Sequence, residues 1–477
     1  MDDDAKYRAL LARDARFDGV FYVGVTTTGI YCRPVCRART PMRSRCVFFR
    51  HAAEAERAGF RACFRCRPEL APSRANATDA VSWLARAAIA RIEAGALNDA
   101  SLDDLARDLG ASSRHVRRAL QREVGVSPAE LAETARLALA KQLLHDEAMT
   151  MTEIAYASGF SSVRRFNAAF RARFGRAPSS LQKRRAESHD TIALTLGYRA
   201  PLAWTALLRF LDARAMPGVE RVDLTAQTYA RTARIAGATG TVVARKHARR
   251  DAIVIEASAS LARSLMPIAS RAKRLFDLDA EPHAIGSHLA RDVALKARVQ
   301  RTPGLRVPGA WDGFEIAVRA VLGQQISVRA ATTLAGRFAR AFGARVASSR
   351  DGLDVAFPDA RTVASAKPAE IRAIGVTASR AKTIASLAQA FANGRLALGG
   401  DPNDALASLE SIDGVGRWTA QYVAMRALGA PDAFPHGDLG LVRALDLTPR
   451  ALRDRSLAWS PWRAYAAMHL WNEGALA

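Results

Sequence analysis

The sequence predicts a multidomain protein that is mainly α-helical and has α+β parts. Three observations lead to this expectation. A chain of 477 residues is longer than one hydrophobic core usually serves, so roughly three or four domains are expected. The five cysteines all lie in residues 32–66, which marks off a small N-terminal domain. A pattern of two helices around a glycine turn occurs twice, in residues 101–128 and 150–178.

Composition limits the partners and the compartment. Hydrophobic residues make up 49% of the chain, enough to form folded cores. Lysine and arginine number 70 against 46 aspartate and glutamate residues, a formal net charge of +24. This excess favours a polyanionic partner such as nucleic acid, although an arginine-rich proteome would also produce it. No apolar run is long enough to span a bilayer and the N-terminus lacks a secretory pattern, so we expect a cytoplasmic protein with reduced thiols.

The cysteines form two close pairs and one single residue. Cys32 and Cys36 are separated by three residues, and Cys63 and Cys66 by two. This is the spacing of a four-cysteine zinc site, in which each Zn–S distance is about 2.3 Å. Two disulfides are the alternative, which a reducing compartment disfavours, and the clustering disfavours five unrelated buried thiols. Cys46 is left over and is expected in the core.

The segments "DGVFYVGVTTTGIYCRPVCRART" and "AGFRACFRCRP" resemble the N-terminal domain of the Ada family of DNA alkylation-repair regulators. We expect such a domain over residues 1–76. In that family the first cysteine is a zinc ligand and also accepts a methyl group from a DNA methylphosphotriester, a role that the resemblance gives to Cys32. Zinc keeps this sulfur a thiolate, and methylation makes the site less negative. Thr28 and Arg39 match family positions near the phosphate, and Arg39 is equally consistent with a solvated surface charge.

The repeated helical pattern has basic second helices. Gly110 marks the turn of the first copy and Gly159 that of the second. A single copy is a weak signal, because any two helices joined by a glycine turn imitate it. Two copies resemble the AraC-type DNA-binding domain, which we place at residues 79–186. The resemblance implies recognition helices near 113–122 and 162–172 in successive major grooves. The candidate DNA contacts are Arg114, His115, Arg117, Arg118, Arg164 and Arg165.

A second chemistry is indicated in the C-terminal half. Gly414, Val415 and Gly416 lie between two helical stretches and resemble a helix-hairpin-helix element, whose backbone N–H groups bind a DNA phosphate. Glycine pairs also end helices for local reasons, so this turn alone is a weak signal. The sequence "FPHGD", ending at Asp438, follows it. Together these features resemble the helix-hairpin-helix DNA glycosylases, whose catalytic aspartate matches Asp438.

Three longer segments are similar to the AlkA type of 3-methyladenine glycosylase. They are residues 190–290, 301–331 and 459–474. The resemblance implies an AlkA-like N-terminal α/β domain at 190–295 and an all-α glycosylase domain at 300–477. Its reaction is hydrolysis of the N-glycosidic bond of 3-methyladenine and related alkylated bases.

The resemblance also gives roles to individual residues. Asp438 stabilises the developing oxocarbenium ion and orients water, and it is equally suited to cap a helix. The base pocket is expected to contain the aromatic residues Trp418, Tyr422, Trp471 and Phe210. Ordinary core packing is the alternative for the tryptophans, and it is the one we expect for Trp459 and Trp462. Glycosylases that also cut the strand have a lysine where this chain has Trp418, so we expect no lyase activity. Gln325 occupies the place of the leucine that fills the gap left by the flipped base.

The sequence therefore predicts a bifunctional protein of DNA alkylation repair. The expected cofactors are one Zn²⁺ and a monovalent cation on hairpin carbonyls such as those of Glu410, Ile412 and Val415. The expected partners are double-stranded DNA and RNA polymerase, in a bacterial cytoplasm near the nucleoid and not at a membrane. Proteins of the Ada family often end in a methyltransferase domain that repairs O6-methylguanine and is marked by the sequence "PCHRV". That motif is absent and no cysteine follows Cys66, so we expect no repair of O6-methylguanine.

Two other hypotheses belong to different functional classes. A pure transcription regulator would use a silent glycosylase fold to bind DNA, and Asp438 with its aromatic neighbours argues against it. A repair enzyme would use the Ada-like part only as a tether, and an intact Cys32 argues against that.

Overall fold

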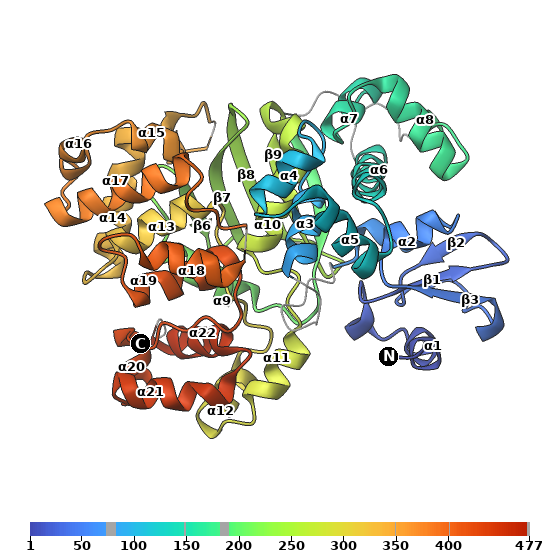
Figure 1. Ribbon diagram of the computed structural model, residues 1–477. Coiled ribbons are helices and arrows are strands. Elements are labelled where there is room, and N and C mark those ends of the chain that lie inside the picture. The colour runs from blue at the N-terminus through green and yellow to red at the C-terminus, as the bar shows by residue number, and fades with distance from the viewer. Residues whose placement is uncertain (73–82, 147–148, 182–189, 349, 400, 475–477) are drawn as a thin grey trace. The chain divides into compact units, whose positions relative to one another are not determined.

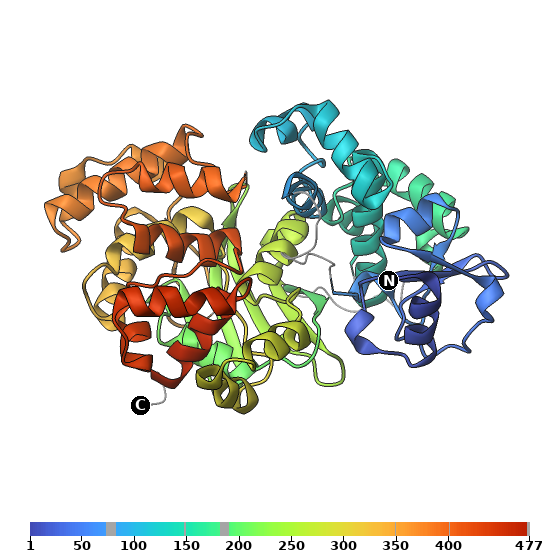
Figure 2. The same cartoon turned by 60° about the horizontal axis from the view of Figure 1, so that its bottom comes forward.

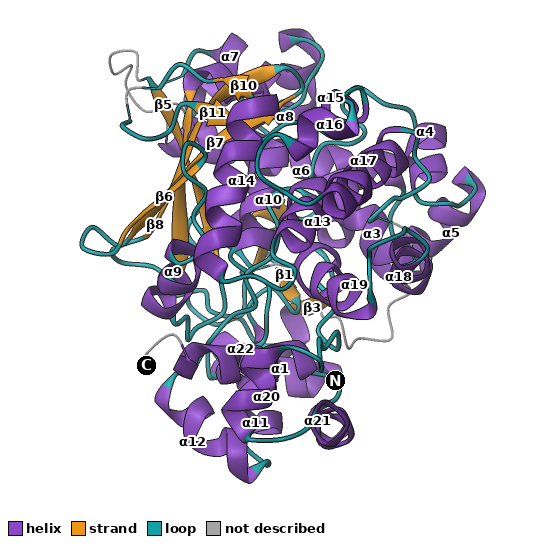
Figure 3. Cartoon of the chain, turned by 90° about the vertical axis from the view of Figure 1, so that its left-hand side faces the viewer, coloured by secondary structure: helices purple, strands orange, loops and turns teal. Residues whose placement is uncertain are grey.

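The chain folds into two compact units. The structure is a computed structural model that describes residues 1–72, 83–146, 149–181, 190–348, 350–399 and 401–474 (Figure 1). The N-terminal unit comprises Met1–Ala200 and His247–Ser270, and the C-terminal unit comprises Pro201–Lys246 and Arg271–Ala477. Helices predominate over strands (Figure 3), so the predicted multidomain, mainly helical class with sheet-containing parts is confirmed.

A small sheet near the N-terminus positions the cysteine pairs (Figures 1 and 2). Its strands, in the order β3-β1-β2-β4, are β1 (Tyr22–Val25), β2 (Ile30–Cys32), β3 (Cys46–Phe49) and β4 (Arg61–Ala62). Strand β2 is parallel to β4, with Tyr31 opposite Ala62. Because parallel strands end at the same edge of a sheet, Cys32 at the end of β2 lies beside Cys63, which follows β4. Two helices accompany this sheet, α1 (Asp3–Leu11) and α2 (Ala52–Arg57).

The described residues between the small sheet and β5 form a series of α-helices. They are α3 (Trp83–Glu93), α4 (Leu102–Asp108), α5 (Ser113–Val124), α6 (Pro128–Asp146), α7 (Met151–Ala157) and α8 (Val163–Phe174). Both α4 and α7 begin on a capping box, formed by Ser101 with Asp104 and by Thr150 with Glu153. The two helix-turn-helix units predicted from the repeated pattern are therefore built on the same local signals.

The second helix of each unit is longer than the recognition helix predicted from sequence. The predicted ranges were 113–122 and 162–172, whereas α5 runs to Val124 and α8 to Phe174. Each helix ends where a glycine takes the left-handed conformation, with φ of 68° after α5 and 67° after α8.

Strands occur again in the segment for which the sequence predicts an α/β domain. In the N-terminal unit, β5 (Thr191–Gly197) pairs antiparallel with β9 (Ala252–Ser258). In the C-terminal unit, helix α9 (Trp204–Asp212) precedes an antiparallel meander of β6 (Glu220–Asp223), β7 (Thr228–Ile235) and β8 (Ala238–Lys246).

Buried ion pairs join this meander to helix α13 (Gly313–Leu322). The side chain of Arg231 on β7 is 2% exposed and lies 2.7 Å from Glu315. Arg319, one turn further along α13, lies 3.2 Å from Glu315 and 2.9 Å from Glu220. Two guanidinium groups and two carboxylates thus neutralise one another, which makes their burial tolerable.

The other helices of the C-terminal unit surround two apolar cores. They are α11 (Pro282–Leu289), α12 (Val293–Arg301), α14 (Val328–Phe342), α15 (Ala360–Ala364), α16 (Pro368–Arg372), α17 (Ala378–Ala392), α18 (Pro402–Glu410), α19 (Arg417–Val423), α20 (Leu439–Leu445), α21 (Pro449–Ser456) and α22 (Arg463–Gly474). Phe338 belongs to one core and Trp459 to the other. Val423 at the end of α19 packs in the first core and Ala424 in the second, so α19 lies between them. Among the described residues, no helix combines the length and the apolar character needed to cross a membrane.

Replacing Glu315 with alanine should destabilise the C-terminal unit. The change leaves Arg231 and Arg319 with a single carboxylate, so we expect the free energy of unfolding to fall by about 3–5 kcal/mol. Urea unfolding followed by tryptophan fluorescence measures this, because Trp83 is the only tryptophan outside this unit. The control is Arg234→Ala, which breaks an exposed ion pair with Asp359 and should cost less than about 1 kcal/mol. Equal losses in the two variants would contradict the importance of the buried cluster.

Candidate functional site

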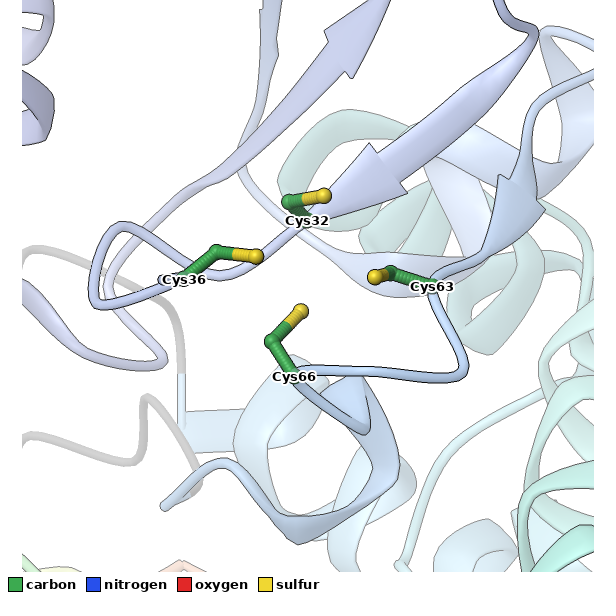
Figure 4. A group of neighbouring side chains, drawn as sticks. All are labelled: Cys32, Cys36, Cys63 and Cys66. Atoms are coloured by element: carbon green, nitrogen blue, oxygen red, sulfur yellow. The ribbon is translucent and has the colours of Figure 1, made fainter. Parts of the chain in front are cut away.

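The two cysteine pairs come together in one cluster. The sulfur atoms of Cys32, Cys36, Cys63 and Cys66 all lie within 4.8 Å of one another and point toward a common centre (Figure 4). A tetrahedral zinc ion with Zn–S distances of about 2.3 Å requires sulfur atoms about 3.8 Å apart. The cluster therefore fits one zinc ion, as the spacing of the pairs predicts.

Thiol chemistry also favours a cation in the cluster. Hydrogen bonding to Cys36 and Cys63 raises the pKa of Cys32, whereas the bond from Cys32 lowers the pKa of Cys36 to about 7. Four sulfurs this close cannot all be negative without a positive charge among them. A bound metal removes the conflict, because its charge stabilises each thiolate.

Arg33, between the first two cysteines, supports the second pair. Its backbone N–H donates to Sγ of Cys66 over 3.4 Å, and its guanidinium donates to the carbonyl of Cys66 over 3.3 Å. The same guanidinium forms an ion pair with the buried Asp18. The sequence shows this arginine beside the cysteines, but its structural role becomes visible only with the partners.

The other predicted residues of this domain lie outside the cluster. Cys46 is buried, packs with Leu10 and Val23, and donates its thiol to a backbone carbonyl, which is the expected core role. Thr28 lies in the turn between β1 and β2, and Arg39 lies after Cys36; both are exposed. Their predicted contact with a phosphate stays a prediction.

The predicted DNA contacts of the helix-turn-helix units are exposed. Helices α5 and α8 turn apolar residues inward, among them Val116 and Phe166. The opposite faces carry the candidate contacts Arg114, His115, Arg117, Arg118, Arg164 and Arg165, all exposed. Both second helices therefore present a basic surface, as binding in a major groove requires.

In the C-terminal unit, three N–H groups hold the carboxylate of Asp438. Its Oδ1 accepts from Trp471 Nε1 at 2.9 Å and from the backbone N–H of Leu441 at 3.1 Å. Its Oδ2 accepts from Trp418 Nε1 at 3.2 Å. The bond from Leu441 makes Asp438 the N-cap of helix α20, and the carboxylate is still partly exposed to solvent. Helices α19, α20 and α22 thus converge on this one side chain.

The predicted pocket aromatics surround this carboxylate. The rings of Trp418 and Tyr422 are stacked, with centroids 5.4 Å apart and an interplanar angle of 11°. The ring centroid of Trp471 lies 6.3 Å from that of Tyr422 and 6.5 Å from that of Phe210. The structure therefore brings all four predicted aromatics together. Trp459 is buried in the core, as expected.

Two arginines that sequence reasoning missed are part of this aromatic group. The guanidinium of Arg214 lies 3.8 Å from the centroid of Phe210 and covers one face of that ring. Arg426 donates to the hydroxyl of Tyr422 at 2.6 Å. Burial would raise the pKa of Tyr422, but the charges of Arg426 and Arg214 outweigh burial and lower it. Each arginine follows a pocket aromatic by four residues, the spacing at which side chains on a helix meet.

The predicted hairpin lies directly before α19. Gly414 has φ of 85°, and a Cβ there would lie 2.1 Å from Oγ1 of Thr383, so only glycine fits. Val415 is buried and donates its N–H to the carbonyl of Ile412 at 2.9 Å, which fixes the shape of the turn. Gly416 is the N-cap of α19, and a Cβ there would meet open space.

Gln324 is a further residue that sequence reasoning missed. Its side-chain amide donates to the carbonyl of Gly414 at 2.9 Å and to Oγ1 of Thr419 at 3.0 Å. It therefore braces the hairpin against α19. The next residue, Gln325, is exposed in the turn before α14 and has a positive φ of 54°. Its predicted role in filling the DNA stack stays a prediction.

Comparison with known protein families gives four matches along the chain. They are the metal-binding domain of Ada (residues 5–69), a helix-turn-helix domain (105–184), the AlkA N-terminal domain (193–312) and the HhH-GPD superfamily of base excision DNA repair proteins (318–451).

Individual relatives agree with this order. The chain is 39% identical to the "Probable bifunctional transcriptional activator/DNA repair enzyme AlkA" of Mycobacterium tuberculosis, over 99% of this chain and 97% of the relative. It is 36% identical to "DNA-3-methyladenine glycosylase 2" of Escherichia coli, over 58% of this chain and 96% of the relative. Among solved structures, the 3-methyladenine DNA-glycosylase of Archaeoglobus fulgidus matches 58% of this chain and 96% of its own, with a TM-score of 0.51 and 23% identity. The structural match shows a shared fold.

Metal analysis of the purified chain should find one zinc ion per molecule. Cys63→Ser removes one of the four sulfurs, so it should lose the metal and make residues 1–72 sensitive to protease, because so small a domain depends on its metal. The matched control is Cys46→Ser, which removes the thiol outside the cluster and should keep the zinc. Full zinc content in Cys63→Ser would contradict the four-cysteine site.

Proposed function

The chain belongs to the family of bifunctional transcriptional activator/DNA repair enzymes named AlkA, and we propose that it senses and repairs alkylated DNA at two separate sites. Its C-terminal part belongs to the DNA-3-methyladenine glycosylase family. The observation that carries the proposal is the presence in one chain of a four-sulfur cluster and of an aspartate held between two tryptophans. We propose domains at residues 1–76, 79–186, 190–295 and 300–477.

We assign the methyl acceptor to Cys32. Cys32 and Cys66 are the partly exposed members of the cluster. The N–H of Arg33 donates to the sulfur of Cys66, which stabilises negative charge there and makes Cys66 the weaker nucleophile. A zinc ion bound by the four sulfurs would supply thiolates at neutral pH without a separate base.

The transfer is a simple displacement. The sulfur of Cys32 attacks the methyl carbon of a methylphosphotriester, the C–O bond breaks, and its electron pair goes to the phosphate oxygen. The DNA regains a phosphodiester, and Cys32 becomes a neutral thioether. Thr28 and Arg39, both exposed, are proposed to contact the flanking phosphates.

Methylation should strengthen operator binding. The cluster loses one negative charge close to DNA phosphates, and repulsion falls accordingly. The exposed arginines of α5 and α8 then hold the two recognition helices on DNA. We propose that the bound protein recruits RNA polymerase and acts in the cytoplasm, close to the nucleoid.

The glycosylase site acts on a base that has left the stack. An alkylated purine such as 3-methyladenine is electron-poor. The aromatic side chains near Asp438 therefore attract the flipped base and stack on it. Arg214 covers one face of Phe210, and the stacked rings of Trp418 and Tyr422 each cover one face of the other, so each of these three rings has at most one face left for a base. The negative charge of Asp438 stabilises the oxocarbenium ion as the glycosidic bond breaks.

Residue identities limit this reaction to base removal. Trp418 is present where strand-cutting enzymes have a lysine, so we propose a monofunctional hydrolase. Gly414 and Gly416 are proposed to bind a phosphate through their backbone, with a monovalent cation on the carbonyls of Glu410, Ile412 and Val415. A regulator with a silent glycosylase fold is the second candidate, and the three donors to Asp438 argue against it, because such an arrangement preserves a reactive geometry.

Mass spectrometry should locate the transferred methyl group on Cys32. The full chain is exposed to duplex DNA that carries methylphosphotriesters and is then digested. We expect one methyl group per chain, in the peptide containing Cys32, because Cys66 is the weaker nucleophile of the two partly exposed cysteines. Methyl found on Cys66 or Cys46 would show that the nucleophile is misassigned.

Asp438→Asn should separate catalysis from DNA binding. The change keeps size and most capping ability but removes the negative charge, so excision of 3-methyladenine should fall at least about a hundredfold. Release of free base from alkylated DNA measures this. Duplex binding and methyl transfer to Cys32 should persist and serve as controls for folding. Wild-type excision would refute the role of Asp438 and favour a different catalytic group.

A further inference from the structure

The second cysteine pair is packed against the helix-turn-helix part of the N-terminal unit. Phe64 lies between Cys63 and Cys66, and its ring is 5.9 Å from the ring of Phe174. The ammonium of Lys141 lies over the Phe64 ring at 4.8 Å. Phe174 is the last residue of α8, the second recognition helix. The loop that supplies two metal ligands therefore touches the end of a DNA-reading helix.

Lys141 makes the closest connection to the cluster. Its side chain is 3% exposed, in the middle of α6, the helix between the two helix-turn-helix units. Its Nζ donates to the backbone carbonyl of Cys63 at 3.2 Å and pairs with Glu69 at 2.8 Å. A buried ammonium is costly unless it is compensated. Lys141 thus places a desolvated positive charge on the backbone carbonyl of Cys63, whose own sulfur belongs to the cluster.

A second connection starts at the residue before Cys32. Tyr31 precedes Cys32 on β2 and donates its hydroxyl to Glu56 at 2.9 Å. The side chain of Glu56 is 5% exposed and forms an ion pair with Arg173, the residue before the end of α8. Thr134 of α6 also donates to Glu56, at 2.6 Å. The segments that carry the two cysteine pairs are therefore both joined to α6 and to the last turn of α8.

Methylation of Cys32 changes the charge that Lys141 experiences. Four thiolates around one divalent ion carry a net charge of about −2, and a thioether reduces it to about −1. Coulomb attraction between buried charges is strong and poorly screened. The attraction that holds α6 against the cluster must then weaken when Cys32 is methylated.

We propose that Lys141 is a positioning residue that couples the sulfur cluster to the second recognition helix, so that methylation of Cys32 loosens the docking of α8 on the zinc domain. This rests on the proposed methyl transfer to Cys32 and adds a regulatory step to it. The released helix carries Arg164 and Arg165, both exposed, and adjusts to the second half of a DNA site. The coupling acts through protein contacts, in addition to the change in repulsion between cluster and phosphate.

Hydrogen–deuterium exchange of the full chain tests the coupling. The protein is compared before and after exposure to a duplex oligonucleotide that carries one methylphosphotriester. The oligonucleotide is removed before exchange is measured. We expect amides in the last turn of α8 to lose protection on methylation, whereas those of α17 in the C-terminal unit stay unchanged. Mass spectrometry of the same samples shows whether Cys32 carries a methyl group. If it carries none, the proposed methyl transfer is refuted. If it is methylated and the exchange of α8 is unchanged, the coupling alone is overturned.

Lys141→Met removes the buried charge and keeps an apolar side chain of similar length. In this variant, the amide exchange rates of the last turn of α8 should no longer depend on methylation of Cys32. The zinc content should stay at one ion per chain. A purely structural lysine would instead lower protection in both states and preserve the difference. Lys141→Gln is the second variant, because it keeps a donor for the carbonyl of Cys63 without the charge, and it should also lose the dependence.

Lys6→Met is the matched control. Lys6 also pairs with an acid, Asp3 at 2.8 Å, and also lies over an aromatic ring, Phe48 at 5.7 Å. These contacts remain within the zinc domain, so the methylation-dependent change in α8 should match that of the wild type. A wild-type change in Lys141→Met or Lys141→Gln would overturn the proposal.

Discussion

Four sulfur atoms within 4.8 Å of one another can all be thiolates only if a cation lies among them, and this constraint governs the four-cysteine part of the N-terminal unit. The parallel pairing of β2 with β4 brings Cys32 beside Cys63. Arg33 then supports the second pair through the N–H bond to Cys66. Lys141 extends the same electrostatic arrangement into α6. The proposed nucleophile activation and the proposed regulation of this unit both rest on this one cluster.

The C-terminal unit depends in the same way on a single carboxylate. Asp438 receives N–H groups from three helices, and the tryptophans that donate two of them also belong to the group of aromatic rings. A carboxylate held by three donors has little freedom to turn, so in the proposed reaction its charge is aligned before the glycosidic bond breaks. Gln324 connects this arrangement to the hairpin, because it bonds both Gly414 and Thr419. The proposed phosphate-binding hairpin and the proposed catalytic helix α19 are therefore braced by the same side chain.

Local signals made much of the fold and of the site predictable. Cysteine spacing predicts the cluster, and capped helices with glycine turns predict the two helix-turn-helix units. Sequence reasoning missed Arg214 and Arg426, which contact aromatic residues only four positions away, and it also missed partnerships between distant residues. The partner of Lys141, Glu69, lies 72 positions away, and Gln324 reaches a carbonyl 90 positions away. Whether a lysine is buried beside a metal site or exposed to water is decided by tertiary packing, which leaves no periodic trace.

The central claim is that one chain carries a single-use acceptor and a catalytic site that work independently. The most direct test incubates the purified chain with an excess of alkylated duplex DNA that contains both methylphosphotriesters and 3-methyladenine. Free base and protein-bound methyl are counted per chain over time. The methyl count should stop at one, on Cys32, while base release continues through many turnovers. Base release that ends when Cys32 is methylated, or that never occurs, would contradict the claim.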